Sequence, residues 1–582
     1  MSLSREIGVF FLSVFIAVGV TTTFLMGGSI FVDDVDVRID PTDGSPVPVS
    51  GFEQTGSPPT AIESFPQFEE VSESAGFIYE PRVPTGIEVV DSGVYVADVN
   101  NDGYEDILAV GEQYPVLFEN VGGEYVPART FEVERVQTAH FFDFYNNGYE
   151  DLLLAQYGGE FIFYENVGGH FVERDIELDT QLLNPSSIVS ADFTGNDCLD
   201  VFVTQNGLWS GTTPLTHAAA QRVEADHPDE RPVTESGNPN LLLHGDCKSL
   251  TDITGQSGID GNQWTLTSSA ADFTGSGWPD IHVGNDWSED YLYINRGDGT
   301  FEKQGLGPDS DRNAMSSNPV DMTGNLAPDI FVTNIYYPEN SNRTSRAPPL
   351  NRDAALPYGN NFFVNDGTGN FTDKALEYGL ERGGWGWTAT VADFTNDGHL
   401  DIIQTTTDVY WVEPYSSEFG SLQVWQGNAE GWEKLSSAEY GLRQSNTYSA
   451  ARVDYNNNGN LDVVIGTAPL GPTLRESAQP FKLYENQRNT TDEYLQFFVR
   501  DPDVLDRNAA VYIETDKRII HKSPNSQGNF QTQDSRLVHV GLENEEVERV
   551  IIKWPDGVTT EYTTLEAGNR YILSQDDIEV VR

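Results

Sequence analysis

The sequence predicts an all-β protein: a seven-bladed β-propeller followed by a small β-rich C-terminal domain, with an N-terminal transmembrane helix. Three observations predict it. A unit of strand, acidic loop and strand recurs seven times, and repeats of this length are typical of propellers. Glycine-containing hairpin turns separate the short apolar runs. One long apolar run stands near the N-terminus. We therefore divide the chain into residues 1–32 (membrane anchor or signal), 33–66 (disordered linker), 67–488 (propeller) and 489–582 (C-terminal domain).

The first element is the apolar run at residues 7–31, whose 25 residues include no charged one. This length suffices to cross a bilayer, whereas a signal peptide usually has a shorter apolar core and a small-residue cleavage site. Arg5 precedes the run and acidic residues follow it, which favours an N-terminus on the inside. We expect a protein tethered to the membrane by this helix, with the remainder extracellular; a cleaved signal and a secreted protein are the alternative. Residues 33–66 are rich in Pro, Gly, Ser and Thr, as an extended linker is.

The charge of the chain limits its partners. The net charge is −58, from 33 basic against 91 acidic residues, and such a surface repels the phosphates of nucleic acids. We therefore expect no nucleic-acid partner. Only 8 of the basic residues are lysine. An acidic, lysine-poor surface is typical of halophilic proteins, because molar salt shortens the Debye length to about 3 Å and screens the repulsion. An ordinary acidic secreted protein is the alternative.

The repeats are centred on nine-residue loops that begin and end with Asp. The loops, numbered one to seven in chain order, span residues 98–106, 143–151, 192–200, 272–280, 321–329, 393–401 and 454–462. An apolar strand follows each loop, and most units continue into a hairpin with an Asn-Gly, Gly-Asp or Asp-Gly turn. Each unit therefore contains about four strands, which is the size of a propeller blade.

The ends of the repeat array predict how the ring closes. The seventh unit reaches KLYENQ (482–487) and lacks a last strand of its own, whereas a matching segment, FEEVSESAGF (68–77), precedes the first unit. We predict that residues 68–77 pair with residues 481–486 in one blade, because a blade shared by the two ends leaves no open edge. A solenoid or an open array is the alternative.

The acidic loops are the candidate metal sites. They place oxygen donors at positions one, three, five and nine, with a backbone carbonyl available at position seven, and Ca²⁺ takes six to eight oxygen ligands on such flexible loops. The predicted calcium ligands, in loops one, three, five, six and seven, are Asp98, Asn100, Asp102, Asp106, Asp192, Thr194, Asn196, Asp200, Asp321, Thr323, Asn325, Asp329, Asp393, Thr395, Asp397, Asp401, Asp454, Asn456, Asn458 and Asp462. Plain Asx turns, with Asp capping backbone amides, are the alternative. That alternative is preferred for loop two, which has Tyr145 at position three, and loop four has only Ser276 at position five.

Three insertions interrupt the repeats, at residues 207–239, 334–359 and 405–421. Each follows the strand after an acidic loop, so in a four-stranded meander all three lie on the face opposite the acidic loops. They contain the aromatic residues Trp209, Tyr336, Tyr337, Tyr410, Trp411 and Tyr415. Exposed aromatic side chains on such loops suit recognition of a glycan or a protein; packing into loop cores is the alternative.

Two further features concern chemistry. His217 and His227 lie in the first insertion without a nucleophile–base pair or zinc-type spacing, so we predict no catalytic residue. Cys198 and Cys247 are the only cysteines. They are too few for a disulfide framework, although an oxidising compartment would allow one bond between them; the bonded and the free state are both possible.

In the C-terminal segment, IIKW and TTEYTTL flank a Pro-Asp-Gly turn and predict a hairpin, with Trp554 in the core.

These motifs resemble known families. The acidic loops and their flanking strands are similar to FG-GAP/VCBS repeats, the blade units of integrin α-chain propellers, over residues 68–487. Residues 494–573 resemble the ASPIC/UnbV domain, with Trp-Pro-Asp-Gly at 554–557 and Asn-Arg-Tyr at 569–571. The glycine-rich hairpin usual in that domain is degenerate at RNAAVYIET (507–515). The combination resembles the cartilage acidic protein family, which implies a secreted calcium-binding architecture.

The sequence therefore predicts an extracellular calcium-binding adhesion or recognition protein, whose insertion-loop face binds a glycan or a protein partner. Ca²⁺ is the only cofactor expected. We expect binding rather than catalysis, with two alternatives. The first is a lyase or glycosidase acting on an extracellular polysaccharide in the central funnel, which converging carboxylates or histidines at the funnel mouth would indicate. The second is a purely structural component of the cell surface.

Overall fold

The structure is a computed structural model with two compact units, Met1–Ala61 and Ile62–Arg582. It describes residues 36–39, 46–49, 64–81, 92–111, 113–176, 178, 180, 182–206, 237–286, 288–336, 342–343, 359–407, 412–413, 420–467, 479–489, 493–501, 504–524 and 528–581.

The N-terminal unit contains a hairpin that the sequence did not predict. Strand β1 (Asp36–Ile39) pairs antiparallel with β2 (Pro46–Val49), within the segment expected to be a linker without packed elements. The intervening residues include Pro-Thr-Asp-Gly, which is a turn signal. The apolar run at 7–31 lies outside the described residues, and none of the helices in the described part of the chain is long and apolar enough to span a bilayer.

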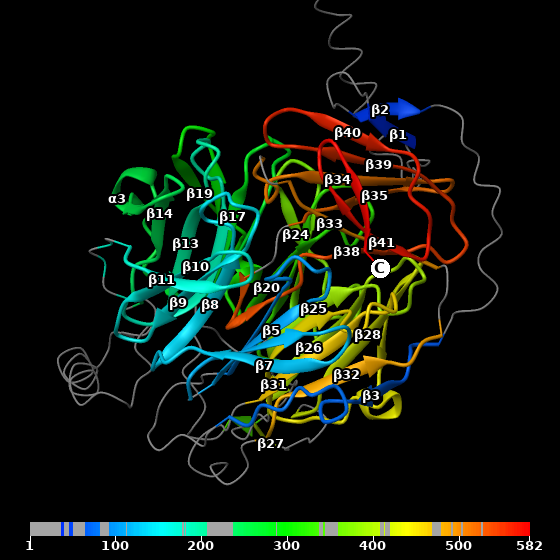
Figure 1. The fold of residues 1–582 in the computed structure, drawn as a ribbon, viewed down its shortest axis with the longest axis horizontal. Coiled ribbons are helices and arrows are strands. Elements are labelled where there is room, and N and C mark those ends of the chain that lie inside the picture. The colour runs from blue at the N-terminus through cyan, green and yellow to red at the C-terminus, as the bar shows by residue number, and fades with distance from the viewer. Residues whose placement is uncertain are drawn as a thin grey trace, which may run out of the picture. The chain divides into compact units, whose positions relative to one another are not determined.

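The larger unit is almost entirely β-structure and begins with a series of four-stranded antiparallel meanders (Figure 1). Their strands are β4 Ser92–Ala97, β5 Asp106–Gly111, β6 Val116–Asn120 and β7 Tyr125–Thr130; β8 Val136–Phe142, β9 Asp151–Gln156, β10 Phe161–Asn166 and β11 Phe171–Arg174; β12 Pro185–Ala191, β13 Asp200–Gln205, β14 Leu241–Gly245 and β15 Leu250–Asp252; β16 Trp264–Ala271, β17 Asp280–Asp286, β18 Tyr291–Asn295 and β19 Phe301–Gly305; β20 Ser316–Val320, β21 Asp329–Thr333, β23 Asn361–Asn365 and β24 Phe371–Asp373; β25 Trp385–Ala392, β26 Asp401–Thr407, β28 Gln423–Asn428 and β29 Gly431–Leu435; and β30 Thr447–Val453, β31 Asp462–Thr467, β32 Lys482–Asn486 and β3 Phe68–Glu70. Among the described residues of this unit, helical structure comprises α3 (Thr254–Ser257) and the 3₁₀ turns η1 (Pro308–Ser310) and η3 (Ser437–Tyr440).

The two ends of the repeat region share one sheet, as predicted. Strand β3 pairs antiparallel with β32, with Phe68 opposite Asn486 and Glu70 opposite Tyr484. Figure 1 shows the blue strand β3 beside the orange strand β32. The strand is shorter than the predicted segment 68–77, because the chain turns after Val71, where the Ala75 N–H donates to the Val71 carbonyl at 2.8 Å.

The first strands of the meanders contact one another in a closed cycle: β4, β8, β12, β16, β20, β25, β30 and again β4. These inner strands are buried on both faces; every residue of β8, β12 and β16 is buried. The outer strand β7 is largely exposed, with only Tyr125 buried. The apolar core lies between neighbouring meanders, as where Tyr95, Phe141 and Phe171 share one cluster. The architecture is therefore propeller-like, with the first strand of each meander innermost.

The C-terminal region forms two further four-stranded sheets that face one another across a shared core. One sheet has the order β38 (Val538–Gly541), β33 (Tyr494–Val499), β41 (Asn569–Leu573) and β42 (Ile578–Val581). The other has the order β35 (Ile519–Lys522), β34 (Ala510–Thr515), β39 (Val547–Lys553) and β40 (Thr559–Tyr562). The predicted hairpin is β39–β40, and Trp554 lies in the core at 3% exposure.

Two of the predicted insertions meet. Strand β22 (Asn342–Arg343), in the second insertion, pairs antiparallel with β27 (Val412–Glu413), in the third. Tyr336, predicted to be exposed, is buried at 4% exposure, with the Arg382 guanidinium 5.8 Å from its ring centroid. The other five insertion aromatics, Trp209, Tyr337, Tyr410, Trp411 and Tyr415, and the two histidines at 217 and 227 lie outside the described residues.

Candidate metal centres in the acidic loops

The acidic loops share one backbone geometry, set by the first Asp. In loop one, Asp98 Oδ1 accepts the backbone N–H of Asp102 at 3.1 Å and Oδ2 accepts that of Gly103 at 3.0 Å. The same two bonds, to the fifth and sixth residues, occur in the other six loops. In loop five the sixth residue is Leu326, which holds a left-handed φ of 68° where glycine would be unstrained.

The ninth residue of each loop ties the loop to its own meander. In loop one, Asp106 accepts the N–H of Val99 at 2.9 Å and that of Asn120 on β6 at 2.7 Å. Corresponding bonds occur in all the other loops. Both aspartates of each loop therefore cap backbone amides, as the Asx-turn alternative expects. This role is common to all seven loops.

The third and fifth residues distinguish the loops. In loop one, Asn100 Nδ2 donates to Asp102 Oδ2 at 3.0 Å. In loop six, Thr395 Oγ1 donates to Asp393 Oδ1 at 3.2 Å. In loop three the Thr194 N–H donates to Asp200, and in loop five the Thr323 hydroxyl donates to Asp329. In loop seven the side-chain oxygens of Asn456 and Asn458 each accept the backbone N–H two residues further on. In each of these loops the structure thus places some of the predicted ligands against one another or against backbone N–H groups of the same loop.

Loop three contains a residue that the sequence analysis missed. His244, on β14, places Nδ1 3.0 Å from Asp200 Oδ1 and 3.0 Å from Thr194 Oγ1. In four other meanders an Asn that donates to backbone carbonyls stands at the end of the corresponding strand, as Asn120 does in the first. The sequence signal was LLLHGD at 241–246, where the other units have a strand ending in Asn.

The carboxylates of these loops are costly to ionise. Burial raises the pKa of Asp106 well above its usual range, and the nearby Asp98 and Asp102 carboxylates raise it further. The same causes raise the pKa of Asp401 and Asp462. Buried like charges oppose folding unless a cation offsets them. Mixed carboxylate, amide and hydroxyl oxygens are the donors that Ca²⁺ prefers, so these loops fit it. The described residues hold no cluster of three or more His, Cys, Asp or Glu placed to bind a metal.

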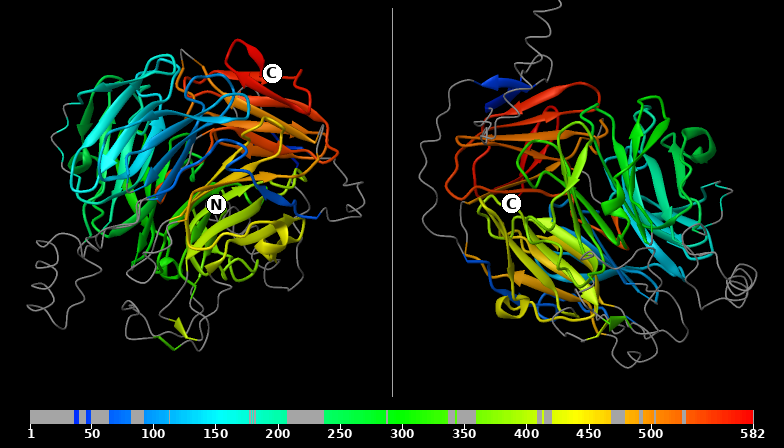
Figure 2. Two further views of the ribbon diagram at one scale, coloured as in Figure 1. Left: turned by 60° about the horizontal axis from the view of Figure 1, so that its bottom comes forward. Right: turned by 180° about the vertical axis from the view of Figure 1, so that it is seen from behind.

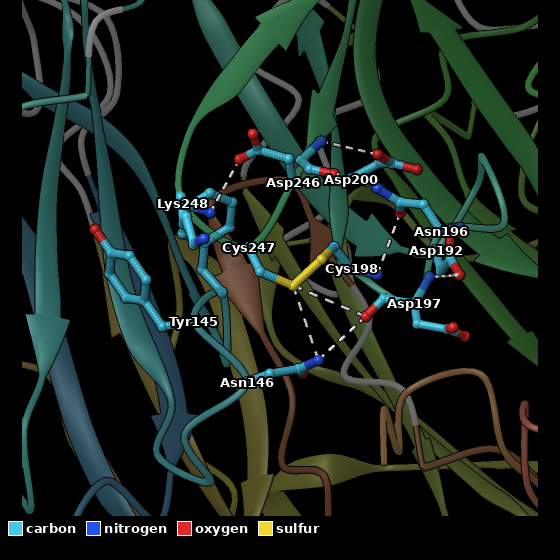
Figure 3. Close-up of a disulfide and its surroundings, with 12 residues drawn as sticks. Tyr145, Asn146, Asp192, Asn196, Asp197, Cys198, Asp200, Asp246, Cys247 and Lys248 are labelled. Carbon is cyan, nitrogen blue, oxygen red and sulfur yellow. Dashed lines mark hydrogen bonds between the residues drawn. A yellow bond between two sulfur atoms is a disulfide. The ribbon is translucent and has the colours of Figure 1, made fainter. Parts of the chain in front are cut away.

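A disulfide joins loop three to the next hairpin. Cys198 and Cys247 are bonded, with their Cα atoms 5.3 Å apart across a sequence separation of 49. Figure 3 shows the bond beside Asn146 of loop two, whose side chain donates to the carbonyl of Asp197 at 3.1 Å. The sequence left this pairing open. The bond fixes the edge of loop three to the β14–β15 hairpin of the same meander, and the Asn146 bond links that edge to loop two.

Reduction of this disulfide is expected to destabilise the larger unit by roughly 2–4 kcal/mol, because the open chain regains the entropy of a loop of this length. Denaturant unfolding with and without reductant measures the change. The variant with both cysteines replaced by serine should match the reduced protein and should no longer respond to reductant. Equal stability of the oxidised and reduced proteins would contradict the expectation.

The C-terminal domain packs on the acidic loops (Figure 2). Arg570 pairs with Asp454 of loop seven at 2.7 Å, and Arg500 with Asp98 of loop one at 3.3 Å. The backbone N–H of Gly541 donates to Asp393 of loop six at 3.1 Å. In all three loops the acceptor is Oδ2 of the first Asp, the oxygen that also caps the sixth residue.

Loops one and two add a glutamate at position eight, which the sequence analysis also missed. Glu150 of loop two, 5% exposed, accepts Arg507 at 2.7 Å and Arg536 at 3.2 Å, and Arg507 is 1% exposed. Arg536 also pairs with Asp506 at 2.6 Å. Glu105 of loop one accepts the Ser535 hydroxyl. The available signal was Glu at position eight, where the other loops have Leu or Pro.

A hairpin of the C-terminal domain enters the ring of inner strands. Residues 528–535, which we name the tongue, contain β36 (Gly528–Asn529) and β37 (Thr532–Gln533). Strand β37 adds to β4 in parallel, with Thr532 opposite Val94. Phe530 packs against Trp387 of β25, with ring centroids 5.3 Å apart. Strand β36 also contacts β12, β16 and β20, and β37 contacts β8 and β30.

Side chains of the tongue bond to backbone groups of the inner strands. Gln533 accepts the N–H of Phe141 at 2.7 Å and donates to its carbonyl at 3.0 Å. Asn529 accepts the N–H of Ser317 at 3.0 Å, and Asp534 accepts that of Arg452 at 3.0 Å. Since the tongue touches all of the inner strands, it lies along the axis that they surround.

Two Ser–His pairs involve the inner strands, although the sequence analysis found no nucleophile–base pair: Ser317, His140 and Ser190 lie on inner strands, and His282 lies on the second strand β17. His282 Nδ1 is 2.7 Å from Ser317 Oγ, and His140 Nε2 is 2.9 Å from Ser190 Oγ. The partners are 35 and 50 residues apart in sequence, so no local motif marks them. Both histidines are 0% exposed, and burial lowers the pKa of His282 to about 3. In this structure neither pair reaches solvent.

His282 should make the fold less stable in acid. The unfolded chain binds a proton near pH 6.5, whereas the folded chain stays neutral down to about pH 3. Stability contributed by neutral His282 is therefore lost as pH falls below 6.5, by about 1.4 kcal/mol per pH unit for one proton. Urea unfolding between pH 6 and 5 should show a slope smaller by this amount in His282→Gln. The exposed His170 provides a matched control, because His170→Gln should leave the slope unchanged; equal slopes in all three proteins would contradict the assignment.

Two models of known protein families match parts of the chain. The model of the FG-GAP-like repeat matches residues 272–332 and 353–403, and that of ASPIC and UnbV matches residues 506–580. No curated protein matches the sequence.

Solved structures give weak similarities. An Agrocybe aegerita lectin, described as recognising non-reducing terminal N-acetylglucosamine, is 17% identical, with a TM-score of 0.37 over 59% of this chain and 79% of the lectin. The extracellular domain of the putative hybrid two-component system BT3049 from B. thetaiotaomicron is 9% identical, with a TM-score of 0.39 over 87% of this chain and 56% of that one. Saccharomyces cerevisiae Sqt1 is 10% identical, with a TM-score of 0.38 over 71% and 98%. At these scores none of the three assigns a ligand to this chain.

Proposed function

We propose that this chain, an FG-GAP-repeat propeller protein with a C-terminal ASPIC and UnbV domain, is an extracellular calcium-binding recognition protein. Its partner is a glycan or a protein, bound on the face that carries the insertions. The propeller has seven blades. The cyclic contacts of the inner strands and the pairing of β3 with β32 support that number.

The observation that carries the proposal is the position of the C-terminal domain. It bonds to loops one, two, three, six and seven, and its tongue lies among the inner strands. The C-terminal domain of the same chain therefore occupies the acidic-loop face and the axis of the propeller. The opposite face carries the connections between second and third strands, where β22 and β27 join two insertions. Binding loops held on a rigid β-scaffold are a common recognition surface.

Calcium has a structural role in this proposal. Loops one, three, five, six and seven hold it through their carboxylate, amide and hydroxyl oxygens, and it supplies the positive charge that offsets their buried carboxylates. The alternative of catalysis in the central funnel is less well supported, since the tongue fills the axis and the two buried histidines there are bonded to serines.

Location and salt dependence belong to the same proposal. The apolar run at 7–31 tethers the protein to the membrane, or is cleaved to release it, and the remainder is extracellular. The net charge of −58 with few lysines adapts the surface to strong salt. The Cys198–Cys247 bond supports an oxidising location.

A binding screen tests the proposal. The full chain in detergent, with calcium, is applied to a glycan array and used to capture proteins from the cell surface. Trp411→Ala in the third insertion should reduce binding to any hit at least about tenfold, the loss of one aromatic contact of about 1.4 kcal/mol. Tyr149→Ala, in loop two on the opposite face, is the matched control and should bind normally. No hit in either screen, or equal losses in both variants, would contradict recognition through the insertions.

A further inference from the structure

The candidate calcium loops differ in how far the C-terminal domain covers them. In loops one, three and five the fifth residue, Asp102, Asn196 or Asn325, is exposed. In loops six and seven every predicted ligand is buried or half-buried. The C-terminal domain also contacts loop one, where Arg570 Nη1 donates to the Gly103 carbonyl at 2.9 Å, and loop three, where Asn508 donates to the Asp192 carbonyl at 3.1 Å. Those contacts leave the fifth residue of each loop exposed, whereas the contacts over loops six and seven leave none of the predicted ligands exposed.

Loop six is covered by β38 and by the turn before β35. Besides the Gly541 N–H bond to Asp393, His539 Nε2 is 2.8 Å from Asn396 Oδ1. Arg518 Nη1 donates to the Gly398 carbonyl at 2.7 Å. The fit is close: a methyl group placed on Gly541 would collide with Asp393 and with the backbone of Asn396. At Gly541 the C-terminal domain therefore packs tightly on this loop, while a cavity lined by Asp393, Lys522 and His539 lies beside it.

Loop seven is covered by β33 and β41. Gln496 Nε2 and Arg570 Nη2 donate to Asp454 Oδ2 at 3.0 and 2.7 Å. Arg570 also bonds to Asn457, and the Tyr494 ring packs so closely on Gly459 that a side chain there would collide with it. These donors use Oδ2, whereas Asp454 Oδ1 bonds within the loop to the Asn458 N–H at 3.1 Å. The cover and a metal therefore need not use the same oxygen.

We propose that the C-terminal domain gates calcium exchange at loops six and seven. The inference rests on the proposed calcium function and adds its regulation. Ions at loops six and seven exchange only when the domain lifts from the propeller, and ions at loops one, three and five exchange while it stays docked. The chain thus contains two sites that exchange calcium slowly and three that exchange it fast.

The physical basis is the stability of the docked state. Release from a covered site requires an opening step, so its rate scales with the small fraction of molecules in which the cover is open. The docked state is stabilised by the tongue and by the buried ion pairs of Glu150, as well as by the contacts to the loops. A change in the tongue should therefore alter release from loops six and seven without touching either loop.

Stopped-flow mixing of the calcium-loaded full chain with excess fluorescent chelator tests this gate. We expect two release phases, with the slow phase carrying two of every five ions. Phe530→Ala removes a tongue side chain that is 4% exposed and far from both loops in sequence. It should accelerate the slow phase about tenfold, which corresponds to about 1.4 kcal/mol. Gln533→Ala, a milder tongue variant, should accelerate it in the same direction if Phe530→Ala fails to fold.

Phe301→Ala is the matched control, because Phe301 is 6% exposed in the core between other meanders. It should leave the slow phase unchanged. A single release phase, a slow phase that neither tongue variant alters, or equal acceleration in Phe301→Ala would overturn the gate while leaving calcium binding intact. A chain that retains no calcium at all would instead overturn the proposed calcium function, and the gate with it.

Discussion

Removing calcium with a chelator at fixed ionic strength should lower the melting temperature of the full chain more than any single substitution in an acidic loop. A ligand that binds only the folded state contributes about 2.7 kcal/mol per site at a hundredfold excess over Kd. Five occupied loops would then contribute roughly 13 kcal/mol. Ionic strength must be held constant, because monovalent salt also screens the repulsion between these carboxylates.

Single-loop variants separate this effect from the capping role of the aspartates. Asp98→Ala should be more destabilising than Asp143→Ala in the presence of calcium, since loop two lacks a donor at Tyr145. Because Arg500 also pairs with Asp98, Asp192→Ala is the closer match: Asp192 and Asp143 both accept the N–H groups of the fifth and sixth residues, and Asp192 also accepts that of Gly195. The difference between Asp192→Ala and Asp143→Ala should vanish in chelator. A melting curve that chelator does not shift would contradict the metal assignment.

Glu150→Ala should destabilise the protein by about 3–5 kcal/mol. The substitution leaves the guanidinium of Arg507, 1% exposed, without its carboxylate and removes one of the two carboxylate acceptors of Arg536. Breaking a buried ion pair from one side costs this much because an uncompensated charge stays buried. Urea unfolding, followed by tryptophan fluorescence, measures the loss.

An exposed ion pair provides the control for Glu150. Glu302 pairs with Arg296 at 2.8 Å, and their side chains are 66% and 56% exposed. Glu302→Ala should cost about 0–1 kcal/mol, since water screens such pairs. If both variants lose the same stability, the packing of the C-terminal domain on loop two is not as the structure has it. Partial recovery in the double variant Glu150→Ala with Arg507→Met would support the charge as the cause.

Local patterns in the sequence predicted most of the propeller. The turn signals and apolar runs gave the hairpin β39–β40. The missing last strand of the seventh unit, together with the spare segment at residues 68–77, predicted the pairing of β3 with β32. Such features depend on neighbouring residues or on comparison of one repeat with the next, so a single sequence contains them.

The contacts of the C-terminal domain could not be predicted in this way. The tongue sequence contains no regular pattern, and its bonds join residues hundreds of positions apart, as Gln533 and Phe141 do. Glu150 was visible as a departure from the other repeats, but its arginine partners were not. A repeat defines its own loop, whereas the surface that packs on that loop belongs to another domain.

The most direct test of this account is the number of calcium ions that the full chain retains at equilibrium. Dialysis against buffered calcium, followed by elemental analysis, should find five ions per chain, one each for loops one, three, five, six and seven. Asp192→Ala should reduce the number to four, and Asp143→Ala should leave it at five. A chain that retains none, or a number that Asp192→Ala does not change, would contradict the account.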